Sequence, residues 1–126
     1  MITNSQNIRN NDWSDYYKRD VCFGVGINPD LPLIICGQQP EPQKSWNENT
    51  EKYDGKVNGY GYWVTQAVKD NQGNIWLQNP VMVIVDGSQP LDFKFGQEVV
   101  FQGLAGYYSR RKYKYMFRAK GIKANA

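Results

Sequence analysis

Residues 60–85 read YGYWVTQAVK-DNQGN-IWLQNPVMVIV, which predicts a strand, a tight turn and a returning strand. The first run is dense in aromatic and β-branched side chains, which favour extended structure. The polar segment after it is typical of a hairpin turn, with Gly73 suited to a positive φ. Pro80 marks an interruption of the returning strand, and the apolar run 81–85 predicts a buried segment. This central hairpin predicts an all-β domain.

Further segments on either side of the central hairpin complete the predicted fold. Four of them are β-type runs: 21–27, 31–37, 98–104 and roughly 112–122. The first two form one bent strand or two short ones, and 91–97 is a connector that need not be a helix. The polar stretch 38–58 is predicted to be a loop of about 20 residues, which is long enough to be either mobile or functional.

These segments match the layout of a five-stranded OB-fold-like barrel over residues 20–123. A chain of 126 residues is sufficient for one such domain with its own core. Residues 1–19 form a polar N-terminal extension, rich in Asn, Asp and Ser, which we expect to be loose in isolation. Its aromatic residues would allow part of it to dock on the body or on a partner: Trp13, Tyr16 and Tyr17.

The charge of the chain is strongly asymmetric. The last 28 residues carry seven basic side chains and no acidic one: Arg110, Arg111, Lys112, Lys114, Arg118, Lys120 and Lys123. Because the whole chain carries +3, the first 98 residues carry −4 against the +7 of this basic region. Aromatic residues are interleaved with the cations over 106–118, and cations with flat rings suit a phosphate backbone with unpaired bases. The alternative is an edge strand kept soluble by its lysines and arginines.

The last predicted strand alternates between two kinds of side chain. One face would carry the mostly charged residues Lys112, Lys114, Met116, Arg118 and Lys120. The other face would carry Tyr113, Tyr115, Phe117 and Ala119. This period of two places the cations together on one surface of the sheet.

In an OB-fold, the face of strands 2 and 3 and the loops after strands 1 and 4 form one ligand groove. We therefore expect a nucleic acid to contact aromatic residues of the first loop, the central strands and the last loop: Trp46, Tyr53, Trp63, Trp76, Tyr107 and Tyr108. The expected phosphate ligands are Arg110, Arg111, Lys112, Lys114, Arg118 and Lys120. Most strand aromatics must instead fill the core of so small a barrel: Tyr60, Tyr62, Trp63, Phe101, Tyr113, Tyr115 and Phe117.

A family resemblance points the same way. The segment Leu91-x-Phe93-x-Phe95-Gly96-Gln97-x-Val99-x-Phe101-x-Gly103-Leu104, closing with Phe117-Arg118-Ala119-Lys120-x-Ile122, resembles the C-terminal halves of small OB-fold proteins of Gram-positive conjugative plasmids and integrative elements. Tyr62-Trp63-Val64 and Asp70-x-x-Gly73 also fit, so that the resemblance covers about residues 40–122. That family includes single-stranded DNA binders and helicase-accessory proteins. The resemblance implies a non-enzymatic protein that binds single-stranded DNA with low sequence specificity, as an accessory to replication or transfer of a mobile element.

Other functional classes find little support in the composition. The chain has no histidine, which removes the commonest general base and the usual zinc ligand, and we expect neither catalysis nor a metal or other cofactor. Cys22 and Cys36 are not in a C-x-x-C arrangement and are expected to be small buried hydrophobic residues, although a disulfide between them stays open. The chain shows neither a long apolar stretch nor the layout of a secretion signal, which predicts a cytoplasmic protein.

Two alternatives to binding of single-stranded DNA stay open. The first is an adaptor that docks on an acidic surface of a helicase or relaxase, with the basic strand pairing edge to edge with its partner. The second is RNA binding of the cold-shock type. The oligomeric state does not follow from the sequence.

Overall fold

The computed structural model describes residues 16–37, 40–47, 52–87, 90–110 and 112–125, and for 44–47, 52–56 and 58 it describes the backbone alone. Within these ranges the one helix is α2 (Arg19–Gly24), which is short. The same ranges hold ten strands: β1 (Leu33–Ile35), β2 (Glu41–Asn47), β3 (Lys52–Thr65), β4 (Ala67–Lys69), β5 (Ile75–Leu77), β6 (Val81–Asp86), β7 (Glu98–Gln102), β8 (Ala105–Ser109), β9 (Lys114–Ala119) and β10 (Gly121–Ala124). The predicted all-β class is confirmed.

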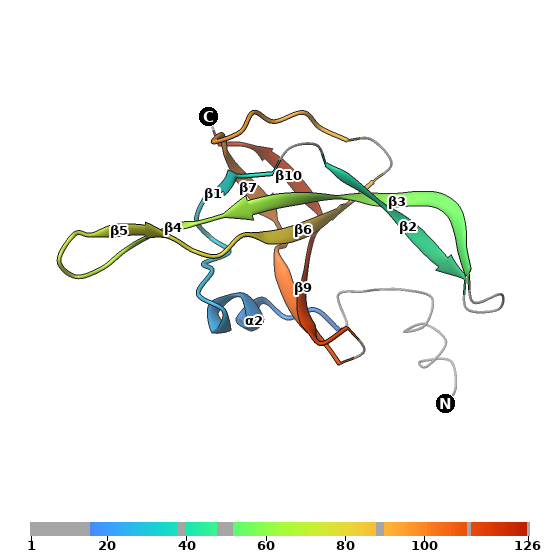
Figure 1. Ribbon diagram of the computed structural model, residues 1–126, viewed down its shortest axis with the longest axis horizontal. Coiled ribbons are helices and arrows are strands. Elements are labelled where there is room, and N and C mark those ends of the chain that lie inside the picture. The colour runs from blue at the N-terminus through green and yellow to red at the C-terminus, as the bar shows by residue number, and fades with distance from the viewer. Residues whose placement is uncertain (1–15, 38–39, 48–51, 88–89, 111, 126) are drawn as a thin grey trace.

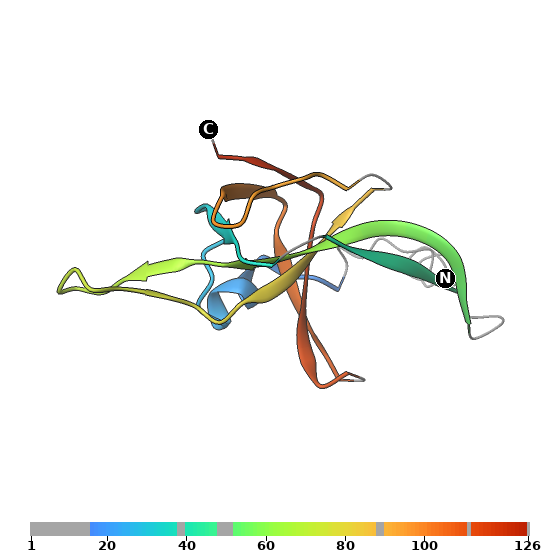
Figure 2. The same cartoon turned by 45° about the horizontal axis from the view of Figure 1, so that its top comes forward.

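Eight strands form one mixed sheet, in the order β10-β7-β1-β3-β6-β9-β8 with β2 paired to β3. Every pairing in it is antiparallel except that between β6 and β9, which is parallel. Strands β4 and β5 form a separate ribbon that extends away from the body (Figures 1 and 2). Among the described residues, no pairing between β10 and β8 closes the sheet into a barrel.

Strands β7 to β10 form one bent antiparallel hairpin. Gly121 lies opposite Gln102 in the first half of the hairpin, and Arg118 lies opposite Ala105 in the second half. The two pairs are three residues apart on both strands, so the register continues through the bend without a shift. At the bend, Gly103 has a φ of 69°, and the Lys120 N–H donates to the Gln102 carbonyl oxygen at 2.7 Å. The first half of this bent hairpin pairs with β1, and the second half pairs with β6. The described residues thus form more strands than the five predicted, because bends divide some predicted strands and because β2 and β8 form where loops were predicted.

The central hairpin is confirmed, including its turn. Gly73 has a φ of 85°, and one carboxylate oxygen of Asp70 accepts hydrogen bonds from the N–H groups of Gln72 (2.9 Å) and Asn74 (2.8 Å). At Gln66 the chain leaves the main sheet, because its side-chain amide is bonded to both backbone groups of Asn28. The ribbon β4–β5 beyond that point exposes its apolar residues: Ile75, Trp76 and Leu77.

The prediction of a strand over 21–27 is wrong, because the segment holds most of the helix α2 and the turn that follows it. The edge of β8 that it approaches is already paired, since Lys18 and Gly106 exchange two backbone hydrogen bonds of 2.7 and 2.9 Å. The chain then coils, with Asp20 in the first turn of the helix, where a negative charge is favourable. This brings Cys22 into the core, fully buried, and both Cys22 and Cys36 are free thiols. Burial raises the pKa of the Cys22 thiol to about 11.

The predicted long loop 38–58 is also wrong, because most of it is the antiparallel hairpin of β2 and the start of β3. Strand β2 is an outer strand, so Pro42 is tolerated there without its missing N–H. The register shifts between Gln43 and Lys44 and again before Trp46. Such irregular pairing by polar residues leaves no simple alternation in the sequence by which it could be recognised.

The core is formed mainly by residues of the main sheet, together with Cys22 and Ile27 from α2 and the turn that follows it. Its fully buried side chains are Leu33, Val64, Val83, Val99 and Cys22. Tyr62, Phe101 and Phe117 are buried with them, as predicted, and Tyr60 packs against the same cluster. Within the described part of the chain, no helix has the length and apolar character that crossing a membrane requires.

A glycine in the middle of the sheet gives a first prediction, on stability. Gly59 lies between Gln43 of β2 and Asp86 of β6, and a Cβ there would lie 2.5 Å from the carbonyl oxygen of Val85. We expect Gly59→Ala to lower the free energy of unfolding by about 1–3 kcal/mol, because backbone in the next strand must shift. Urea denaturation measures this. Gly24→Ala is the control, since a Cβ there meets no atom within 4 Å, and equal losses in the two variants would contradict the prediction.

Candidate nucleic-acid interface

The candidate site is built on the hairpin of β8 and β9. Ser109 pairs with Lys114, and Arg110, Lys112 and Tyr113 belong to the turn between them. Tyr107 and Tyr108, which were predicted to lie in a loop, are on β8 instead, because they pair with Met116 and Tyr115 of the adjacent strand. The shorter turn leaves the two rings near its cations.

An open groove of about 570 Å³ runs along this hairpin. It is lined by Tyr17, Tyr107, Tyr108, Ser109, Arg110, Lys112 and Met116. The Tyr107 ring is held from the N-terminal side, with its centroid 5.3 Å from that of Tyr17 and 6.2 Å from that of Tyr16. The groove thus brings together four of the residues predicted from the sequence: Tyr107, Tyr108, Arg110 and Lys112.

The two faces of the hairpin both carry rings. Successive residues of a strand point to opposite faces, so Tyr107 and Met116 share one face, while Tyr108 and Tyr115 share the other. The rings of Tyr108 and Tyr115 meet edge to face at a centroid distance of 5.0 Å and are 44% and 49% exposed. The expectation that Tyr115 fills the core is wrong, because the hairpin extends past the body that would cover it (Figure 2).

The turn presents a further ring to solvent. Tyr113 has a φ of 55° and is 82% exposed, so the expectation that it lies in the core is also wrong. The alternation predicted for 112–120 is confirmed over β9, where Phe117 and Ala119 are buried and Lys114 is on the opposite face. It does not extend to Tyr113, because the turn rather than the strand sets the direction of that ring.

Arg118 differs from the other predicted cations. One of its guanidinium nitrogens donates to a carboxylate oxygen of Asp86 at 2.6 Å, and only 18% of its side chain is exposed. It also lies beside Tyr17, where burial raises the pKa of the phenol although the guanidinium acts to lower it. The charge of Arg118 is thus compensated inside the protein, and it helps to hold Tyr17 beside Tyr107. Lys114 and Lys120 are exposed, and neither lines the groove.

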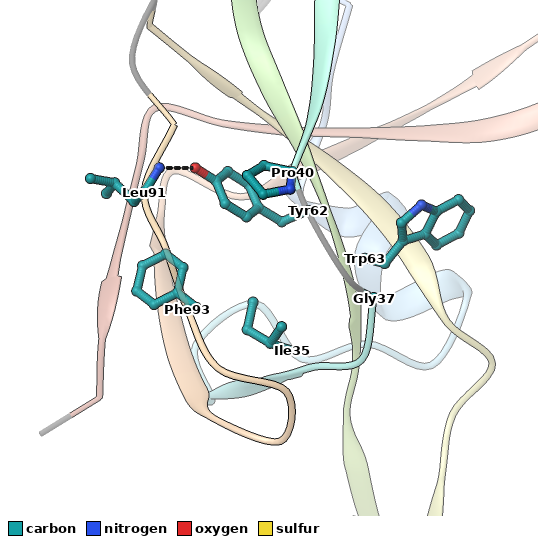
Figure 3. A pocket seen from close by; sticks show the side chains of 7 residues that line it. All are labelled: Ile35, Gly37, Pro40, Tyr62, Trp63, Leu91 and Phe93. Atoms are coloured by element: carbon teal, nitrogen blue, oxygen red, sulfur yellow. Dashed lines mark hydrogen bonds between the residues drawn. The ribbon is translucent and has the colours of Figure 1, made fainter.

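The predicted aromatic residues of the central strands lie elsewhere. The indole N–H of Trp63 donates to a carboxylate oxygen of Glu41 at 2.7 Å, and Trp63 borders a cavity of about 10 Å³ with Tyr62 and Phe93 (Figure 3). The Tyr62 hydroxyl accepts a hydrogen bond from the Leu91 N–H at 2.9 Å beside that cavity. A volume of this size accommodates about one water molecule, so the cavity is no ligand pocket.

Trp76 is half exposed on the ribbon β4–β5, which leaves the body in a different direction from the hairpin of β8 and β9 (Figures 1 and 2). The prediction of one groove shared by Trp63, Trp76 and the basic hairpin is therefore wrong. The backbones of Trp46 and Tyr53 pair with each other across β2 and β3, but their side chains lie outside the described part of the structure. Arg111 also lies outside the described residues.

Sequence reasoning missed three residues of the candidate site. Tyr17 was expected only to allow docking of an otherwise loose extension on the body or on a partner, Tyr113 was assigned to the core, and Met116 only to a face of the strand. The alternation Lys112-Tyr113-Lys114-Tyr115 gave no signal for the exposed rings, since a half-buried strand with its rings in the core has the same pattern.

Comparisons of the chain with protein-family models, with curated proteins and with solved structures gave no match. The residues of this hairpin and their geometry are the basis for assigning a function.

Proposed function

We propose that the protein is a non-enzymatic binder of single-stranded nucleic acid, with DNA as its ligand and little preference for sequence. The observation that carries the proposal is the groove in which the Tyr107 ring lies with the exposed cations Arg110 and Lys112. A cation attracts any phosphate, and an aromatic ring stacks on any base, so this combination binds without reading sequence. Stacking on such a ring contributes about 1–3 kcal/mol per base.

We also propose that the domain is OB-fold-like. The support is its pattern of pairing: β1, β3 and β6 form a meander, β6 pairs in parallel with β9, and β7 returns to β1. With the bent hairpin taken as the fourth and fifth strands, the turn between Ser109 and Lys114 is the loop that joins them. That loop is one of those through which OB-folds bind oligonucleotides, and the hairpin of β2 and β3 would stand at another.

A titration with a fluorescently labelled oligothymidine, followed by anisotropy at several salt concentrations, tests the proposed function. We expect the logarithm of the affinity to fall with the logarithm of the salt concentration, by about 0.7 for each phosphate neutralised. Competition with oligouridine of equal length then decides between DNA and RNA. Affinity that is absent, or that does not change with salt, would contradict the proposal.

The adaptor remains the alternative function. Edge-to-edge pairing by the basic strand is blocked at Phe117 and Arg118, where β9 is paired with β6 on one side and with β8 on the other, whereas the pairing with β6 does not reach 114–116. An adaptor would use the exposed cations against an acidic helicase or relaxase surface, and it would bind no oligonucleotide in the absence of that partner. A role in replication or transfer of a mobile element is part of either proposal.

A further inference from the structure

The turn between β8 and β9 holds an aromatic residue in a conformation that side chains rarely adopt. Tyr113 has a φ of 55° in the left-handed region, where Gly and Asn are the usual turn residues. The turn is fixed beside it, since the Lys112 N–H donates to the Ser109 hydroxyl at 3.2 Å. A tyrosine is therefore not required for the turn, and its ring is 82% exposed at the end of the hairpin.

The hairpin below this ring offers stacking surfaces on both sides. Tyr107 is on one face, and the Tyr108–Tyr115 pair is on the opposite face. A uniform single strand that follows the groove would meet Tyr107 and Tyr108, which line it, but neither Tyr113 nor Tyr115, which do not. Two strands that separate at the end of a duplex would each find rings on one face, with Arg110 and Lys112 of the turn near the phosphates at the point of separation.

Resting on the proposed function, we infer that the preferred ligand of this hairpin is a junction between double-stranded and single-stranded DNA. The Tyr113 ring stacks on the last base pair of the duplex, as apolar side chains do when they are inserted at a base step. The two unpaired strands diverge along the two faces of the hairpin. The last base pair of a duplex is stacked on one side only, so the tyrosine takes the place of the missing neighbour without separating two stacked pairs.

The test compares three labelled ligands by anisotropy at one salt concentration: a forked duplex with two oligothymidine arms, one arm alone, and a blunt duplex. We expect the wild-type protein to bind the fork at least about fivefold more tightly than the arm, the factor that corresponds to stacking on one base. The blunt duplex should bind more weakly than the fork. The adenine analogue 2-aminopurine, placed in the terminal pair, should change its fluorescence when the protein binds.

Tyr113→Gly is the decisive variant, because glycine accepts the positive φ and removes only the ring. We expect it to bind fork and arm equally, with its affinity for the arm within about twofold of wild type, and to leave the 2-aminopurine signal unchanged. Tyr113→Trp should restore the preference, and Phe95→Ala, which removes another exposed ring, should keep it. Wild-type protein that binds arm and fork equally would overturn this inference and leave the proposed function intact. Failure to bind any of the three ligands would overturn both.

Discussion

The double substitution Arg110→Ala with Lys112→Ala is expected to weaken the binding of a short oligothymidine roughly 60-fold at about 50 mM salt. Both side chains line the groove beside Tyr107, and both are exposed. Each phosphate contact with a single strand contributes about 0.7 to the slope of log affinity against log salt concentration, so losing two lowers the slope by about 1.4. Anisotropy titrations of the variant and of the wild-type protein at several salt concentrations measure both quantities.

A matched control separates a local contact from net charge. Lys69→Ala with Lys94→Ala removes the same charge from the ribbon β4–β5 and from the connector before β7, where both lysines are exposed. We expect the affinity of this variant for the oligothymidine to stay within about threefold of the wild-type value, because charges beyond about 10 Å are screened at ordinary salt concentrations. If the two double variants weaken binding equally, the groove is not the binding surface.

Phe117→Ala is expected to lower the free energy of unfolding by about 3–5 kcal/mol. Phe117 is 3% exposed and belongs to the main core cluster. Its ring packs closely against Gly106, since a Cβ added to that glycine would lie 3.0 Å from the nearest ring atom of Phe117. The site cannot close around an alanine, since Gly106 is held by pairing with Lys18 as well as with Phe117. Urea denaturation followed by tryptophan fluorescence measures the loss.

Phe95→Ala serves as the control for this second variant, because the same ring is removed from a residue that is 78% exposed. We expect the free energy of unfolding to change by no more than about 0.5 kcal/mol, as for most surface substitutions. A comparable loss at both positions would show that Phe117 is not a core residue.

The parts of the fold that the sequence predicted are those in which local chemistry and burial agree. The turn at Gly73 needs a positive φ, Pro80 cannot continue a strand, and 81–85 is apolar because β6 is central in the sheet. The hairpin of β2 and β3 was missed because its polar residues show no alternation. The helix α2 was missed because six residues are too few to display a helical period, and because its place depends on the edge of β8 rather than on its own sequence.

The same distinction holds for the site. Tyr107, Arg110 and Lys112 gather in one groove because they belong to one hairpin, where neighbours in sequence are neighbours in space. To predict whether Trp63 and Trp76 lie near this groove, one would need to know the directions of two other hairpins. Those directions depend on the point at which the chain leaves the main sheet, Gln66, and on the hydrogen bond from Trp63 to Glu41. No pattern in the sequence specifies either.

The bent hairpin has a consequence for the order in which the chain folds. Its two arms are joined by a turn of few residues, so they can pair early, whereas Leu33 must find Val99 across most of the domain. The entropy lost in closing so long a segment is recovered only when that contact forms. We expect the docking of β1 onto β7 to limit the rate of refolding, which places it in the range of milliseconds to seconds that is usual for β-rich domains.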